Sequence, residues 1–184
     1  MRSIFLASAI LVLASAQLSA QVYMTRTGKI NFDATSKSSP EKIEAKNNEV
    51  ACVLDTRTSD LRFQVLVKGF KFEKTLMEEH FNENYMESGK YPKAEFKGTI
   101  ANAKDVNCSK DGTYSATVSG KLTIHGATND VTVPGTITVK GSTLVLSAKF
   151  SVKLEDYKIS VPSLVADKLA KVATVTVDAD LSKK

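Results

Sequence analysis

The sequence contains few of the residues that metal sites and disulfide-rich folds require. It has no tryptophan, two cysteines and two histidines in 184 residues. Neither histidine, His80 or His125, has a second histidine or a cysteine at ligand spacing, which argues against zinc. Cys52 and Cys108 are too few for a disulfide scaffold, and the sequence leaves open whether they pair. We therefore expect no metal and no other cofactor.

The chain also lacks a dense basic patch and, after residue 20, a long apolar segment. Lys and Arg number 25 against 20 Asp and Glu, and they are spread along the sequence. Without a basic stripe interleaved with aromatic residues, nucleic acid is not an expected partner. No segment after residue 20 is apolar enough to cross a membrane as a helix. The sequence does not decide between a monomer and a homodimer.

The first twenty residues have the pattern of a signal peptide. Arg2 precedes an apolar stretch at 4–13, and small residues follow at Ala14, Ala16 and Ala20. The apolar stretch is shorter than the ~20 residues that span a bilayer. We therefore predict a signal peptide at residues 1–20 and one domain at residues 21–184. An exported protein, located in the periplasm, is the expected consequence.

The remaining chain is dominated by apolar and polar residues that alternate with a period of two. Such alternation is typical of half-buried β-strands. It is regular at 94–100, 114–124, 131–139, 144–154 and 175–181, and less regular at 30–32, 43–54 and 61–72. Turn signals such as Asp111-Gly112 and Lys140-Gly141 separate these segments. The pattern predicts an all-β domain, either a sandwich or a closed barrel.

One segment has helical periodicity instead. Residues 75–86 place apolar side chains along one stripe, and Thr75 with Glu78 has the spacing of a capping box. Gly89 and Pro92 are expected to end the helix. Its glutamates are interpreted as a solvated helix face rather than as acid-base groups. Because the sequence also has no phosphate loop, nucleophile elbow or catalytic triad, we predict that the protein is not an enzyme.

The aromatic residues and methionines concentrate where the expected helix follows a strand. Each of these side chains alone is expected to belong to a core, but together they predict an apolar helix that closes an apolar barrel. Methionine is common on surfaces that adapt to a flexible partner. The predicted ligand-lining residues are Phe63, Val65, Val67, Phe70, Leu76, Met77, Phe81, Tyr85, Phe96, Ile100, Leu122, Ile124, Phe150 and Val152. His80 and Tyr91 are the candidates for contact with a polar head group, although a hydrogen-bonded structural histidine is an alternative for His80.

Three blocks of the sequence match the pattern of a known family. Residues 76–98 look like its helix, Tyr-Pro turn and following strand. Residues 121–134 match its LTIHGVT…VTVP segment, and residues 150–162 match its penultimate-strand region. On these blocks the chain resembles the YceI family of exported lipid- and polyisoprenoid-binding proteins. One departure is that the strand before Gly28 is expected to be short, without the Trp and His that often open the family's first strands.

The resemblance implies an eight-stranded antiparallel lipocalin-like barrel with a short helix near its mouth. It further implies a ligand with a long apolar chain inside the barrel, such as a polyisoprenoid, an isoprenoid quinone or a fatty-acid derivative. We therefore predict a carrier or sequestering protein for a long-chain lipid or isoprenoid. The alternative is a β-structured interaction or stress-associated protein whose interior is fully packed and holds no lipid.

Overall fold

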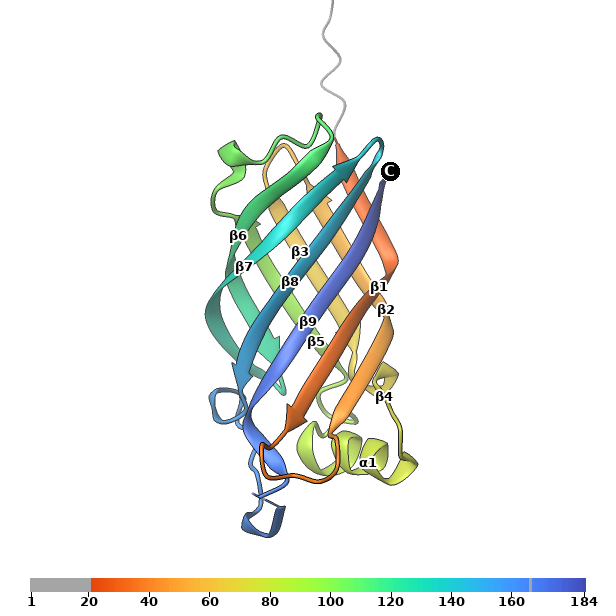
Figure 1. Ribbon diagram of the computed structural model, residues 1–184, viewed down its shortest axis with the longest axis vertical. Coiled ribbons are helices and arrows are strands. Elements are labelled where there is room, and N and C mark those ends of the chain that lie inside the picture. The colour runs from red at the N-terminus through yellow and green to blue at the C-terminus, as the bar shows by residue number, and fades with distance from the viewer. Residues whose placement is uncertain (1–20, 166) are drawn as a thin grey trace, which may run out of the picture.

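The computed structural model describes residues 21–165 and 167–184, and the predicted signal peptide at residues 1–20 lies outside them. Within these ranges, no helix is long and apolar enough to cross a membrane. Nearly all regular structure is antiparallel β-sheet (Figure 1). The strands are β1 (Val22–Thr35), β2 (Glu44–Asp55), β3 (Asp60–Leu66), β4 (Lys71–Phe72), β5 (Lys93–Ile100), β6 (Gly112–Ile124), β7 (Ala127–Lys140), β8 (Thr143–Lys153) and β9 (Leu169–Lys183).

The eight long strands close into a barrel. Their order is β1-β9-β8-β7-β6-β5-β3-β2, and β1 pairs with β2 to complete the circle. The two-residue β4 adds to one end of β2. Strands joined by short connections lie next to each other, as expected for an antiparallel meander. The predicted eight-stranded antiparallel barrel is therefore confirmed, and the sandwich is excluded.

The first strand is longer than the sequence indicated. β1 begins at Val22 rather than near Gly28 and pairs with both β2 and β9. Register shifts interrupt its pairing with β2 between Thr25 and Gly28 and between Gly28 and Ile30. An irregularity of this kind moves side chains to the other face of a strand, so the period-two pattern is lost. The expectation of a short first strand was wrong for this reason.

One side of the barrel wall is paired over only half its length. The ladder between β7 and β8 runs from Lys140 opposite Thr143 to Gly135 opposite Ala148 and stops there. Beyond that point, residues 127–134 of β7 pair only with β6, and residues 149–153 of β8 pair only with β9. Pro134, which has no N–H to donate, lies where the pairing stops. We call these two unpaired edges the seam.

Short contacts bridge the seam at its open end. After β8 the chain forms a 3-10 turn, Glu155–Tyr157, whose carbonyl groups face the start of β7. The side-chain amide of Asn129 donates a hydrogen bond of 2.8 Å to the Asp156 carbonyl oxygen. The Nδ1 atom of His125 lies 3.1 Å from the Tyr157 carbonyl oxygen and donates to it. The β8–β9 connection is thus attached to β7 across the seam.

A helical segment covers the end of the barrel that carries these turns (Figure 1). It consists of α1 (Thr75–His80) and a π-helical turn, Phe81–Tyr85, which we call together the lid. The predicted capping box does not form, because the first cap position is Lys74 and no side chain caps it. Glu78 instead pairs with Lys71 at 2.6 Å and accepts a hydrogen bond from the Phe72 amide. The helix is therefore attached to β4 rather than capped by its own residues.

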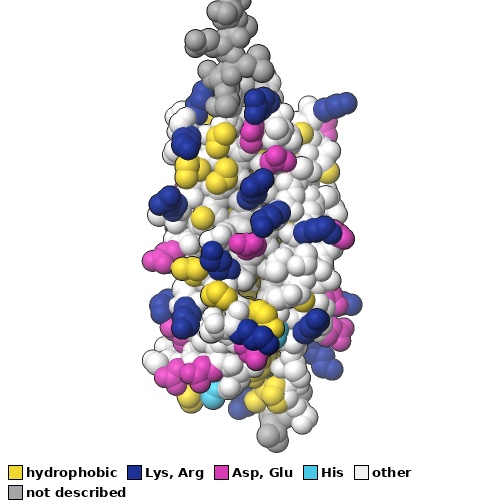
Figure 2. Space-filling view, turned by 180° about the vertical axis from the view of Figure 1, so that it is seen from behind, with side chains coloured by type: hydrophobic (Ala, Val, Ile, Leu, Met, Phe, Trp, Pro, Cys, Tyr) yellow, Lys and Arg dark blue, Asp and Glu magenta, His cyan; other side chains and the backbone are white. Residues whose placement is uncertain are grey.

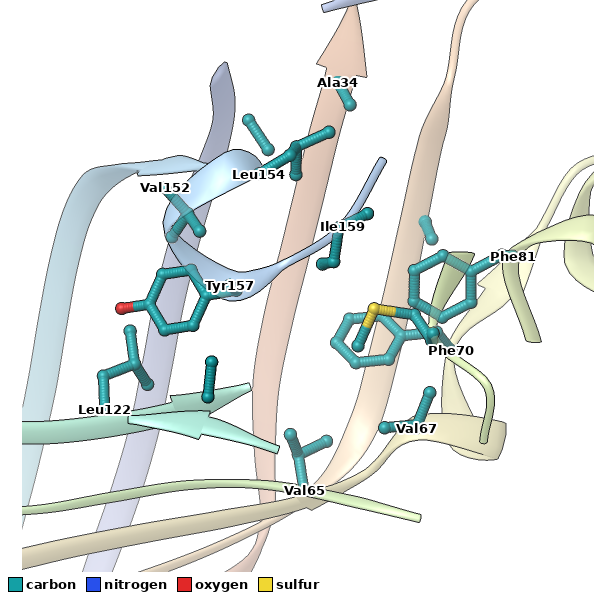
Figure 3. Packing of buried hydrophobic residues seen from close by; sticks show 14 of the residues in the cluster. Ala34, Val65, Val67, Phe70, Phe81, Leu122, Val152, Leu154, Tyr157 and Ile159 are labelled. Atoms are coloured by element: carbon teal, nitrogen blue, oxygen red, sulfur yellow. The ribbon is translucent and has the colours of Figure 1, made fainter. Parts of the chain in front are cut away.

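The interior is divided between two clusters of buried side chains. The upper cluster, at the end opposite the lid, contains fully enclosed residues such as Leu54, Leu144 and Leu181. The lower cluster lies beneath the lid, where Phe70, Phe81 and Val65 point into the barrel (Figure 3). Both cysteines pack in or against the upper cluster, and both are free thiols. Outside, charges of both signs are mixed, as Figure 2 shows for one face.

Candidate functional site

The lower half of the barrel contains a cavity of about 560 Å³. Inward-facing side chains of all eight long strands border it, together with the lid and the β8–β9 connection. They are mainly Val, Ile, Leu, Phe, Met and Ala, which explains how alternation in the sequence becomes a continuous apolar wall. A cavity of this size, lined this way, is typical of sites that hold a small apolar molecule. The interior is therefore not fully packed.

The structure brings most of the predicted ligand-lining residues together around this cavity. They come from β3, β5, β6 and β8 and from the segment that contains the lid. The members that border the cavity are Phe63, Val65, Phe70, Leu76, Met77, Phe81, Tyr85, Phe96, Leu122, Ile124, Phe150 and Val152. The lining also contains Gly135 and Ala148, where the seam begins.

Two predicted lining residues are buried elsewhere. Val67 follows the last residue of β3 and starts a 3-10 turn, so the alternation that includes Val65 does not continue to it. Ile100 ends β5 in the upper cluster, beyond the cavity. Both side chains are shielded from solvent but are not among the described residues that border the cavity. The period-two pattern identified the correct face and not the depth along the strand.

One aromatic side chain packs the lid onto the barrel, in addition to the contacts of Glu78. Phe81 packs against Phe32, Phe70 and Phe72, with ring centroids 5.9, 5.6 and 5.0 Å away. Tilted aromatic pairs at these separations contribute about 0.5–1.5 kcal/mol each beyond their buried area. Leu76, in the first turn of the lid, borders the cavity but is 61% exposed. The lid is thus anchored at its centre and open at its outer end.

Charged side chains from three connections gather where the cavity opens, and Glu95 of β5 also borders the cavity. Glu41, from the β1–β2 connection, forms an ion pair with Lys74, the residue before the lid. The hydrogen bond from Lys74 holds the pKa of the Glu41 carboxyl below its ordinary value, and the charge of Lys168 lowers it further. His80 also borders the opening, where its Nδ1 atom lies 2.9 Å from the side-chain amide of Asn84. The cavity therefore has an apolar interior and a charged mouth.

Tyr91, the second head-group candidate, does not reach this mouth. Its ring stacks edge-on against His125 with centroids 4.7 Å apart, and it lies against Gly126 so closely that no side chain would fit there. The Nε2 atom of His125 also lies 2.9 Å from a carboxylate oxygen of Glu87. These contacts fix the β6–β7 turn to the segment after the lid. Tyr91 is thus a packing residue of that turn.

Several residues of the mouth could not be predicted from the sequence. Glu41 and Lys74 lie in connections far apart in the chain, and Lys168 is the last residue of the β8–β9 connection. Their meeting depends on which connections share one end of the barrel. Alternation along single strands cannot contain that information. Prediction of their proximity would require the strand order of the barrel, which decides which connections lie at the same end.

The wall of the cavity is mainly hydrocarbon, and the charged residues that border it in the described part of the chain are Glu41, Lys74, Glu95 and Lys168. Residues 21–165 and 167–184 contain no group of three or more His, Cys, Asp or Glu side chains that could hold a metal ion. The arrangement can enclose an apolar group and leave a polar group in water. That is the geometry of a binding site.

An antiparallel barrel with an apolar cavity under a helical lid defines a lipocalin-type fold, and comparison with known proteins agrees with it. The family model of the YceI-like domain matches residues 15–181, so the chain belongs to that family. No curated protein matches the chain.

Solved structures share the fold at low sequence identity. A polyisoprenoid binding domain from Saccharophagus degradans, implicated in plant cell wall breakdown, is 11% identical with a TM-score of 0.76, covering 90% of this chain and 99% of that chain. BcnA from Burkholderia cenocepacia is 18% identical with a TM-score of 0.67, covering 84% and 96%. A YceI protein from Campylobacter jejuni is 14% identical with a TM-score of 0.60, covering 78% and 86%.

Proposed function

We propose that this barrel binds a long-chain amphiphile and carries or sequesters it, with the hydrocarbon tail in the cavity. The observation that supports the proposal is the apolar cavity of about 560 Å³ beneath the lid. A polyisoprenoid, an isoprenoid quinone or a fatty-acid derivative has the required chemistry. The Saccharophagus degradans domain, which shares this fold, is described as polyisoprenoid-binding. Catalysis is not part of the proposal.

Apolar burial supplies the affinity in this proposal. Each buried methylene contributes about 0.8 kcal/mol, whereas association costs an estimated 4–15 kcal/mol. A tail of roughly ten or more buried carbons is therefore needed for useful affinity. A small polar metabolite would gain too little in so apolar a wall. The polar head would remain at the mouth near His80, Lys74 and Lys168.

We further infer that the protein works in the periplasm. Residues 1–20 have the three-part pattern of a signal peptide, and removal after Ala20 would leave the barrel domain, residues 21–184. The test is the mass of the protein recovered from the periplasmic fraction. A mass equal to that of a chain beginning at Gln21 supports the proposal, and an uncleaved chain in the cytoplasm contradicts it.

The experiment that tests binding is organic extraction of the purified full chain, with native mass spectrometry of the same sample. We expect a co-purified amphiphile whose mass is dominated by hydrocarbon. Delipidated protein should then bind a fluorescent apolar probe, and matched lipids should displace it. Protein without extractable lipid that also fails to bind the probe would contradict the proposal.

The displacement titration also separates the contribution of the tail to the affinity from that of the head group. Shortening a tail by four carbons within the cavity should remove about 3 kcal/mol of binding free energy, which is more than a hundredfold in Kd. Exchanging the head group or raising the salt concentration should change Kd less, because the mouth charges are solvated and screened. Strong head selectivity with no dependence on tail length would contradict this mechanism.

A further inference from the structure

The cavity ends half-way along the barrel, at a defined layer of side chains. Leu61, Ala116, Ile137 and Leu146 border the cavity and also belong to the upper cluster. We call these four residues the floor. The next inward-facing residues on β7 and β8 are Val139 and Leu144, and neither is among the described residues that border the cavity. The upper cluster therefore closes the cavity from one side.

The distance from the mouth to the floor can be obtained from the strands. On β8 the wall extends from Val152, near the mouth, to Leu146 in the floor. At about 3.3 Å per residue this stretch is about 20 Å long, or about 15 Å along the axis of a barrel whose strands tilt by about 40°. An extended hydrocarbon advances about 1.3 Å per carbon, given C–C bonds of about 1.5 Å. A straight tail of about 12 carbons would therefore reach the floor.

The volume gives a second tail length in the same range. A methylene group occupies roughly the 30 Å³ that a water molecule occupies in the liquid. A cavity of about 560 Å³ therefore corresponds to roughly 20 carbons of a tail that is bent or branched. The two lengths correspond to the tails of fatty-acid derivatives and to about two to four isoprene units.

We propose that the floor measures the ligand tail, and that this protein selects amphiphiles with tails of about 12–20 carbons. The inference rests on the proposed function and specifies its ligand class. Each methylene up to the limit is buried and strengthens binding. Carbons beyond the limit remain in water at the mouth and add nothing. The residues of the floor therefore determine specificity: Leu61, Ala116, Ile137 and Leu146.

The experiment measures Kd for a series of carboxylates with 8 to 24 carbons, by displacement of the apolar probe below their micelle concentrations. For the wild-type chain we expect Kd to fall about fourfold with each methylene, the equivalent of about 0.8 kcal/mol, and then to become constant. The tail length at which Kd becomes constant should lie between about 12 and 20 carbons.

Variants of the floor should move that length in opposite directions. Leu146→Ala removes about three carbons from the floor and should extend the longest useful tail by about three. Ala116→Leu adds the same number and should shorten it, with Ala116→Val as the milder variant if Leu prevents folding. The matched control is Leu144→Ala, on the same strand and face of β8 but behind the floor. It should lower stability like Leu146→Ala and leave the limit unchanged.

The outcomes distinguish a failure of the proposed tail-length limit from a failure of the proposed function. If no tail binds, the proposed function is wrong. If tails bind but affinity continues to rise beyond about 20 carbons, the tail leaves the barrel, for example through the seam, and the floor does not measure it. If the tail length at which Kd becomes constant is unchanged in both Leu146→Ala and Ala116→Val, the floor does not set it and the proposal is overturned. A shift of that length in the expected directions supports the proposal.

Discussion

Cys52 illustrates what the barrel interior does to a single polarisable side chain. It lies on β2 within the upper cluster, fully shielded from solvent. Burial raises the pKa of its thiol to about 12, because the thiolate would lose its hydration. Burial also raises the pKa of Cys108, which is half-buried against the same cluster. Both thiols are therefore weak nucleophiles in the folded protein.

We predict that a disulfide-exchange reagent at pH 8 modifies Cys108 slowly and Cys52 only after unfolding. In the unfolded chain both thiols should react at once, and a Cys108→Ser variant should show no reactive thiol while folded. Since the pKa of Cys52 is raised, its contribution to stability is complete below the ordinary value of 9.0 and declines above it. Rapid labelling of Cys52 in the native state would contradict its placement in a packed cluster.

Sequence patterns were informative about single residues where a strand is regular. Phe63, Phe96 and Phe150 face the interior as their alternation with polar neighbours requires, because one buried face fixes the register. The patterns failed at strand ends. Val67 and Tyr91 lie in turns, where the direction of a side chain depends on tertiary contacts that alternation does not describe.

The lid is the element whose local structure differs most from its sequence pattern. Apolar spacing indicated one helix over residues 75–86, and helical structure does extend over 75–85, but its second half is π-helical. π-helical turns are rare and frequently lie at functional sites. Here the turn contains Phe81, which packs on Phe32 and Phe72 of the barrel. We infer that this aromatic contact selects the local helical geometry.

We predict that Phe81→Ala lowers the free energy of unfolding by about 3–5 kcal/mol and speeds ligand release, because the lid loses its aromatic contacts with the barrel. The matched control is Leu76→Ala on the same lid. Leu76 is mostly solvent-exposed, so its removal should change stability by about 0.5 kcal/mol or less. Denaturant unfolding of delipidated protein and probe dissociation in stopped flow give the two quantities. Equal effects of the two substitutions would contradict the role of Phe81.

The two halves of the barrel differ in packing and in their proposed roles. The upper half is packed side chain against side chain and supplies the rigid closure, while the lower half is hollow and carries the lid and the mouth. Alternation was sufficient to predict an all-β domain, and the resemblance to the YceI family favoured the eight-stranded barrel over a sandwich. They could not predict where packing ends and the cavity begins, because apolar residues such as Leu144 and Leu146 are equivalent in the pattern and differ only in what lies across the barrel.

The seam has a consequence for how the molecule exchanges its amide hydrogens. Amides of residues 127–133 that point toward β8 have no partner strand, whereas residues 135–139 are paired on both sides. We predict that, by deuterium exchange and mass spectrometry, about half of the amides in 127–133 exchange quickly while those in 135–139 are protected. Uniform protection along β7 would contradict the seam.

A barrel wall that is unpaired along one line should also open there first. Separation of β7 from β8 in the lower half breaks no ladder hydrogen bond between them. It breaks the hydrogen bonds of His125 and Asn129 to the β8–β9 connection and part of the apolar packing in the lower cluster. The least stable cooperative unit of the protein should therefore consist of the lid-side halves of these two strands. The upper cluster would remain folded while the lower barrel widens and recloses.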